Sequence, residues 1–254
     1  IMDVSVCMAT YNGEKFIKKQ LVSILDELDQ HDELVIVDDC SKDQTVQIIE
    51  SFNDSRIKLY INNINHREVF SFNKAISFSK NRYIFLSDQD DIWIKGRVLK
   101  MKIKLKNSYL VSSNFTWIDE LNQNIKIIHD GVSEKYSENN FKNIYDIYIG
   151  KTNYYGCAMA FERSILDYAF PIPSNVESHD LWFALVGNIL CKNIHINECT
   201  LLKRDHTNNT TNTISNRSIY KKLFSRIIFS LNIVTIIKRI FSMNLNKNRL
   251  FLKN

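Results

Sequence analysis

Glycine, proline and paired cysteines are scarce in this chain of 254 residues, and each shortage excludes a class of protein. With 6 Gly and 2 Pro, the sequence has neither the glycine repeat of collagen nor the composition of mucin-like or disordered chains. The five cysteines are odd in number and none forms a CxxC pair, which argues against a disulfide framework and a structural zinc site. We therefore expect reduced thiols in a cytosolic protein.

Long apolar runs are also missing. Asp3 interrupts the first apolar run and no basic segment precedes it, so the sequence predicts no signal peptide. The most apolar stretch, residues 227–237, contains Ser230, Asn232 and Thr235 and is too short to span a bilayer.

The positive charge is confined to one end of the chain. Residues 203–254 contain 11 Lys and Arg and a single acidic residue, Asp205, whereas residues 1–202 contain 22 basic and 27 acidic residues. This asymmetry indicates an acidic body with a basic tail that is suited to an anionic surface such as phospholipid or nucleic acid.

Apolar periodicity predicts an α/β domain. Short β-branched runs alternate with helical patterns, which is typical of βαβ units in a mostly parallel, doubly wound sheet flanked by helices. The expected strands are 3–9, 34–37, 57–61, 83–87, 109–117, 155–161 and 194–202; the expected helices are 16–28, 44–52, 70–79, 95–107, 163–169 and 178–190, with loops and a short helix between 119 and 153. A polar linker at 207–216 divides a domain of residues 1–212 from a helical tail of residues 213–254.

Three polar segments follow the first, second and fourth expected strands and would meet at one edge of the sheet. Asp88, Asp90 and Asp91 lie in the last of them, and clustered carboxylates repel one another unless a cation offsets their charge. Oxygen ligands suit Mg²⁺ or Mn²⁺, and such ions hold diphosphates. The alternative is a solvated acidic loop.

A nucleoside pocket is expected beside this acidic segment. Thr10 and Tyr11 end the first strand and Asp39 ends the second, so that Tyr11 would offer an aromatic face and Asp39 would accept from a base N–H. The alternative for Asp38 and Asp39 is a cap of the following helix.

The order of six segments resembles the bacterial family 2 glycosyltransferases with a GT-A fold, over roughly residues 3–212. The segments are VSVCMATYNGEKFI, ELVIVDDCSKDQT, YIFLSDQDDIW, YYGCAMAF, ESHDLWFALV and KRDHTNNT. The most similar branch assembles O-antigen and capsule repeats and includes β-1,3-galactosyltransferases and rhamnosyltransferases.

The resemblance implies roles for individual residues. Tyr11 and Asp39 would hold the base, Asp88 would face the ribose or metal, Asp90 with Asp91 would bind Mn²⁺ or Mg²⁺, and His206 would close on the metal or diphosphate. Asp180 matches the catalytic base; its alternative is a charge at a helix N-terminus, as that of His206 is an ordinary loop histidine. The residues expected to contact the acceptor are Trp93, Gly156, His179 and Trp182.

Two residues depart from the family pattern. Cys40 and Arg67 stand where the family often has glycine. If either backbone needs a positive φ, the substitution costs about 1 kcal/mol or changes the turn.

The tail predicts a basic amphipathic helix from Ser218 onward, lying on a membrane or packed on the body or on a second subunit of a homodimer. Apolar residues recur at helical spacing and basic residues flank them: Tyr220, Phe224, Ile227, Ile228 and Leu231 are the apolar ones, and Lys221, Lys222, Arg226, Lys238 and Arg239 the basic ones.

Taken together, we expect an inverting, metal-dependent glycosyltransferase at the cytoplasmic face of the cell membrane. It would move galactose from UDP-galactose, in β-1,3 linkage, to a polyprenyl-diphosphate-linked sugar; dTDP-rhamnose is the alternative donor. Two other classes stay open. A sugar nucleotidyltransferase would need a glycine-rich phosphate loop where this chain has only Gly13, and a nucleic-acid-binding protein would use the basic tail.

Overall fold

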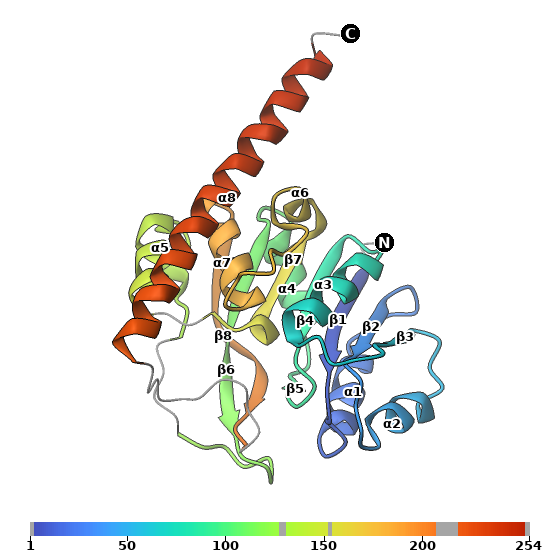
Figure 1. Ribbon diagram of the computed structural model, residues 1–254. Helices are drawn as coiled ribbons and strands as arrows, with labels where there is room; N and C mark the ends of the chain where they lie inside the picture. Colours follow the sequence, from blue (N-terminus) through green and yellow to red (C-terminus); the bar gives the residue numbers. More distant parts are fainter. Residues whose placement is uncertain (1–2, 127–130, 152–153, 207–217, 252–254) are drawn as a thin grey trace.

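An eight-stranded mixed sheet runs through the computed structural model, which describes residues 3–126, 131–151, 154–206 and 218–251. The strand order is β3-β2-β1-β4-β7-β6-β8-β5, and helices cover both faces of the sheet (Figure 1). The α/β class expected from the sequence is confirmed.

The first half of the sheet is parallel. Strands β1 (Val4–Thr10), β2 (Glu33–Asp38), β3 (Ile57–Ile61) and β4 (Tyr83–Ser87) alternate with helices α1 (Ile17–Leu25), α2 (Thr45–Ser51) and α3 (Glu68–Phe78). Strands β2 and β4 are buried throughout and β1 nearly so, which explains why they are apolar runs without alternation. Their carboxyl ends share one edge.

The second half of the sheet mixes directions. Strand β7 (Met159–Glu162) is antiparallel to both β4 and β6 (Leu110–Ile118), and the short β5 (Ile92–Trp93) is antiparallel to β8 (Asn193–Arg204). Of the seven pairings between described strands, four are parallel. The sheet is therefore less parallel than expected, because a buried apolar strand has the same pattern in either direction.

The other described helical elements connect these strands: α4 (Arg97–Leu105), η1 (Glu134–Tyr136), α5 (Asn140–Ile149), η2 (Gly156–Ala158), η3 (Arg163–Ile165), α6 (Leu166–Ala169) and α7 (His179–Ile189). The strand expected at 155–161 begins as the turn η2 and becomes extended only at Met159. Strand β8 continues two residues beyond the expected end, which places Lys203 and Arg204 in the sheet.

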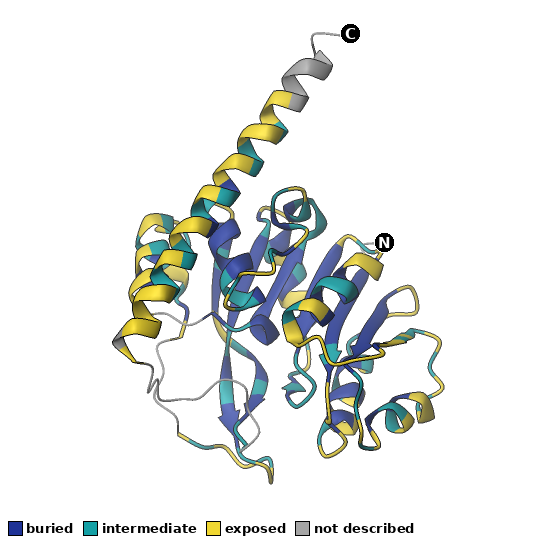
Figure 2. Cartoon of the chain, viewed as in Figure 1, coloured by how far each residue is buried: buried dark blue, intermediate teal, exposed yellow. Residues whose placement is uncertain are grey.

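Two apolar clusters lie on the two sides of the sheet. Figure 2 shows the strands between them as mostly buried. Val6 and Met8 of β1 pack toward α1, α2 and α4, whereas Cys7 of the same strand packs toward α3 and α7. Helix α7 is almost wholly buried and begins at Ser178, whose hydroxyl accepts from the N–H of Leu181.

The tail is helix α8 (Ile219–Phe251), which crosses α6 and α7 and then projects away from the sheet (Figure 1). Ile236 is fully buried against the body, and Arg239 donates to the carbonyl oxygens of Tyr168 and Pro171. One of the expected arrangements, packing on the body, is thus present along part of the helix. Nowhere in the described residues is there a helix with the length and apolar character needed to cross a bilayer.

Candidate active site

The loops after β1 and β4 are bonded to each other at the carboxyl edge of the sheet. The side chain of Gln89 accepts from the N–H of Tyr11 at 2.9 Å and donates to the Tyr11 carbonyl at 3.0 Å. A Cβ at Gly13 would lie 2.3 Å from Gln89 Oε1, so a larger residue there would have to displace the Gln89 side chain. The phenol of Tyr11 is 44% exposed, as a surface for a base must be. Sequence reasoning had given Gln89 no role.

Thr10 and Asp39 are not open to a ligand in this structure. The Thr10 hydroxyl donates to Asp38 and is buried. The carboxylate of Asp39, 3% exposed, accepts from the N–H groups of His66 and Arg67 and from the amide of Asn62. The expected contact of Thr10 with the donor is therefore wrong for its side chain, and a base would reach Asp39 only if the loop at 65–67 moved.

Both residues that replace a family glycine have positive φ. Cys40 has φ 68°, and Arg67 has φ 71° with ψ 170°, a region populated almost only by glycine. The hydrogen bond from Arg67 N to Asp39, 2.7 Å long, holds this strained backbone in place. The conditional expectation of local strain is thus met at both positions.

The side chains of Asp90 and His206 lie next to each other, although Asp90 follows β4 and His206 follows β8. Nε2 of His206 is 2.8 Å from Oδ2 of Asp90, and both side chains are largely buried. Arg204 aligns the two segments, since its Nε donates to the Asp90 carbonyl and its guanidinium lies 4.6 Å from the Phe16 ring, which also contacts His206. The structure therefore brings these two expected ligands together.

Asp91 belongs to the interior instead. Its Oδ1 accepts from the N–H of Arg204, and its buried Oδ2 has no hydrogen-bond partner among the described residues. Burial raises the pKa of Asp91 to about 7, although Lys203 opposes this. The expectation that Asp91 acts with Asp90 and His206 is corrected, because its carboxylate faces Asp88 and Cys157 rather than His206.

Lys203 was not anticipated. Its Nζ lies 3.1 Å from Asp88 Oδ2, inside the sheet, and Asp88 itself is partly exposed. Burial alone would lower the pKa of Lys203, but Asp91, Cys157 and Asp88 around it raise the pKa well above its usual value. Lys203 therefore places a positive charge beside the carboxylates of the loop after β4.

The expected base, Asp180, is at the start of α7 beside His179. His179 Nε2 and Asp180 Oδ1 lie 2.8 Å apart but are not aligned for a hydrogen bond. A Cβ at Gly156 would lie 2.7 Å from His179 Nε2 and 2.8 Å from Asp180 Oδ1, so glycine leaves the room that this pair occupies. Burial favours a neutral Asp180, yet His179 and the N–H of Gly156 hold its pKa below the usual value.

A further carboxylate faces this pair. Glu68 begins α3, and its electrostatic partners are His179, Asp180 and Asp88. Partial burial of the carboxyl group raises the pKa of Glu68, although the residue as a whole is exposed. Asp88 and Asp180 are thus both within electrostatic range of Glu68.

The two tryptophans expected at the acceptor lie in the core. Trp182 is 1% exposed and donates from Nε1 to the Ala169 carbonyl, with Arg239 against its ring. Trp93 is 4% exposed and packs between Phe85 and Arg97. Neither ring can receive a sugar, so both assignments are corrected; an apolar residue in the core and one under a sugar look alike in sequence.

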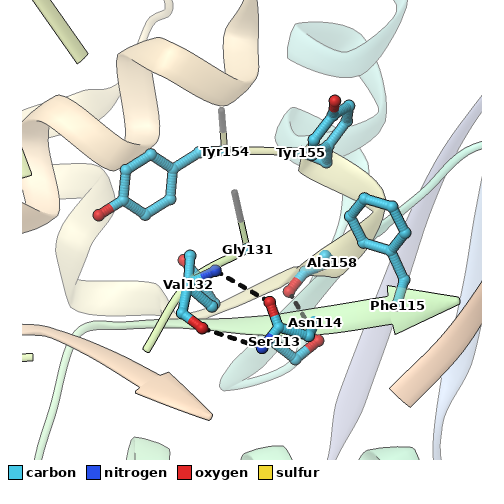
Figure 3. A pocket seen from close by; sticks show the side chains of 9 residues that line it. Ser113, Asn114, Phe115, Gly131, Val132, Tyr154, Tyr155 and Ala158 are labelled. Carbon is cyan, nitrogen blue, oxygen red and sulfur yellow. Dashed lines mark hydrogen bonds between the residues drawn. The ribbon is translucent and has the colours of Figure 1, made fainter. Parts of the chain in front are cut away.

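The described residues also form a small cavity and an open hollow. The cavity, bounded by Ser113, Asn114, Tyr154 and neighbouring residues, holds about 10 Å³, room for one water at most (Figure 3). Asn114 closes it by hydrogen bonds to Val132. The open hollow, about 410 Å³, is bounded by Asp119, Glu120, Leu121, Asp205 and His206. Only the hollow is large enough for part of a substrate.

The sequence profile described as glycosyl transferase family 2 matches residues 5–170. The chain belongs to glycosyltransferase family 2. Two curated members are similar over shorter segments. The chain is 35% identical over 106 residues to the UDP-Glc:alpha-D-GlcNAc-diphosphoundecaprenol beta-1,3-glucosyltransferase WfgD of Escherichia coli, covering 41% of this chain and 42% of WfgD. It is 36% identical over 98 residues to the dTDP-rhamnosyl transferase RfbG of Shigella flexneri, covering 36% and 34%.

The matched segments thus span about two fifths or less of these two family 2 members. Among solved structures, S. aureus TarS residues 1–349 in complex with UDP-GlcNAc has a TM-score of 0.65 at 19% identity, covering 95% of this chain and 73% of that one. This likeness concerns the fold, and it confirms the GT-A architecture that the sequence resemblance implied.

The divalent ion that the sequence resemblance implies needs suitable ligands among the residues of this site. Asp90 and His206 fit it, because a carboxylate and an imidazole already point at each other beside an open hollow. Asp88, Asp91 and Cys157 also bring one ligand atom each within 4.8 Å of one another, but the Lys203 ammonium already contacts Asp88 and Cys157. The first pair, not the second group, suits the ion.

Proposed function

We propose that this protein is an inverting glycosyltransferase that transfers a hexose from a UDP-hexose to a lipid-diphosphate-linked sugar in O-antigen or capsule synthesis. The observation that carries the proposal is that Asp88, in the loop that also holds Asp90, lies within electrostatic range of His179 at the start of α7. Asp90 pairs with His206, and Asp180 pairs with His179. Family membership argues against the sugar nucleotidyltransferase and the nucleic-acid-binding alternatives.

On the donor side, the exposed ring of Tyr11 would stack on the base, and Asp90 and His206 would hold Mn²⁺ or Mg²⁺. When bound there, the ion would neutralise charge on the departing diphosphate. Asp39 would join the base only after its bonds to the loop at 65–67 open, so donor binding and loop position would be coupled.

On the acceptor side, Asp180 would take the proton of the attacking hydroxyl. Its lowered pKa keeps it ionised and ready to accept a proton, while the neighbouring imidazole limits its basicity. Because a single base acts from the face opposite the leaving group and no protein nucleophile intervenes, the anomeric configuration inverts. Gly156 would serve this site by leaving room for the side chains of His179 and Asp180.

The sugar is the least constrained part of this proposal. Galactose is the expectation from sequence, the WfgD relative is named for UDP-glucose, and the RfbG relative is named for a dTDP-rhamnosyl donor. The experiment is a panel of UDP-galactose, UDP-glucose and dTDP-rhamnose, with MnCl₂ or EDTA, scored by release of the nucleotide. A manganese-dependent signal with a UDP-hexose supports the proposal. Preference for dTDP-rhamnose replaces the donor, and no signal with any sugar contradicts the activity.

We also propose that α8 lies on an anionic membrane at the cytoplasmic face, where a lipid-linked acceptor would be met. On the side away from Ile236 the helix exposes an apolar stripe, the residues Tyr220, Leu223, Phe224, Ile227, Leu231, Val234, Ile237, Phe241 and Leu245. Lys221, Arg226 and Lys238 flank or interrupt the stripe, and the described part of α8 contains no acidic residue. An apolar face bordered by basic residues suits anionic lipid.

Deleting α8 would uncover the pocket of Ile236, so substitutions in the stripe are the better test. The variant F224S/L231S should lose sedimentation with phosphatidylglycerol vesicles, whereas F141S, which removes an exposed phenylalanine from α5, should keep it. Retained vesicle binding by F224S/L231S would contradict the membrane assignment. A concentration-dependent dimer that the same variant abolishes would assign the stripe to a second subunit.

A further inference from the structure

A cluster of potential metal ligands, Asp88, Asp91 and Cys157, lies next to the proposed donor site. One ligand atom each from Asp88, Asp91 and Cys157 come within 4.8 Å of one another, and Oδ2 of Asp91 is buried with no hydrogen-bond partner among the described residues. Three such groups at this spacing are what a cation site requires.

The ammonium of Lys203 already contacts two members of this cluster, Asp88 and Cys157. Its Nζ is 3.1 Å from Asp88 Oδ2 and 3.5 Å from Cys157 Sγ. The rings of Tyr155 and Trp117 lie 5.4 Å and 5.9 Å from the same atom and present favourable faces to a cation. Lys203 is 8% exposed, and it comes from β8, whose pairing with β6 fixes its position.

An ammonium and a divalent ion cannot share this space, because like charges a few ångströms apart in the interior repel strongly. We propose that Lys203 is a positioning residue that, through its contacts with Asp88 and Cys157, keeps a metal out of the cluster of Asp88, Asp91 and Cys157 and confines the divalent ion to Asp90 and His206. This inference rests on the proposed function only for what the ion at Asp90 and His206 does.

The lysine also sets the orientation of Asp88. By holding Oδ2 of that carboxylate from within, Lys203 leaves the exposed third of the Asp88 side chain to face the donor. Lys203 thereby offsets the charge of Asp88 without an ion. One divalent ion, at Asp90, is then enough to offset the rest of the charge of the acidic segment.

Cobalt titration tests this placement without turnover. A cobalt–thiolate bond gives an intense near-ultraviolet charge-transfer band, so CoCl₂ reports directly on whether Cys157 is a ligand. The wild-type protein should show no such band. K203M should show it, and K203M/C157S should lose it again. K203R, which keeps the cation, should behave as the wild type does.

A thiolate band in the wild-type protein that C157S abolishes would overturn the proposal, because metal would then enter beside Lys203. Its absence from K203M that circular dichroism shows to be folded would also overturn it. If K203M does not fold, K203Q carries the same expectation, and the wild-type result stands by itself. Failure of the nucleotide-sugar panel would contradict the enzymatic proposal and leave the cobalt result unaffected, so the two failures are distinguishable.

Discussion

His206 and Asp90 lie 116 positions apart in the chain, yet Nε2 of one is 2.8 Å from Oδ2 of the other. The contact exists because β8 continues to Arg204 beside β6, which returns the following residues to the loop after β4. If β8 ended two residues earlier, the chain would not bring the imidazole of His206 to Asp90.

Removing either partner should abolish the effect of manganese on UDP binding. We expect D90A and H206A to lower UDP affinity in MnCl₂ by at least about tenfold and to leave affinity in EDTA unchanged, because the ion links protein to diphosphate. Isothermal titration measures both. D167N, which changes an exposed carboxylate on α6, is the matched control. A full manganese effect in D90A would remove Asp90 from the metal site.

The pair His179 and Asp180 should make stability depend on pH. Burial opposes protonation of His179, but Asp180, Asp88 and Glu68 around it raise its pKa above 6.5, so its contribution is complete below 6.5 and declines as pH rises through the raised value. The pKa of Asp180 is below 3.8, so its contribution is present above 3.8 and declines as pH falls through the lowered value. Denaturant unfolding from pH 3 to 9 measures the profile.

H179Q should remove the alkaline decline in the free energy of unfolding and also weaken the acidic decline, because His179 is one of the groups that hold the pKa of Asp180 low. Identical pH profiles for H179Q and the wild-type protein would contradict the assignment of the titrating group.

Trp182 should behave as a core residue. W182A should reduce the free energy of unfolding by about 3–5 kcal/mol, because it empties a fully buried site and removes the bond to the Ala169 carbonyl. W182F should recover most of that loss. Denaturant titration measures stability, and steady-state kinetics of the folded fraction should give an unchanged acceptor KM. A stable W182A with a raised acceptor KM would restore the sugar-platform role.

Relieving the strain at residue 67 should stabilise the protein. With φ 71° and ψ 170°, Arg67 adopts a conformation that glycine accepts freely, so R67G should raise the free energy of unfolding by about 1 kcal/mol. N53G is the control, because Asn53 at φ 46° is in a region that asparagine tolerates and should gain less. Destabilisation by R67G would indicate that the arginine side chain, not its backbone, matters at this position.

The sequence predicted those features that depend on short-range pattern. The uninterrupted apolar runs ending at Thr10, Asp38 and Ser87 gave three neighbouring parallel strands and hence the edge on which the site lies. The roles of Asp90, Asp180 and His206 came from family resemblance, and they stay predictions even though the structure places Asp90 beside His206.

The remaining features depend on long-range packing. An apolar run does not reveal whether the strand is parallel or antiparallel, so the direction of β7 could not be predicted. In the sequence Lys203 resembles the first residue of a basic tail, whereas in the structure it belongs to β8. Trp93 and Trp182 were misassigned because burial depends on neighbours distant in sequence. Likewise, the bonds from His66 and Arg67 to Asp39 join segments 27 and 28 positions apart.

The most direct test of the central claim is transfer by D180N of a UDP-hexose to a soluble analogue of a lipid-diphosphate-linked sugar, in the presence of MnCl₂. The account predicts that kcat falls at least about 100-fold while the dissociation constant for UDP is unchanged, and that the wild-type product has the inverted anomeric configuration. Wild-type turnover by a folded D180N, or retention of configuration in the product, would contradict it.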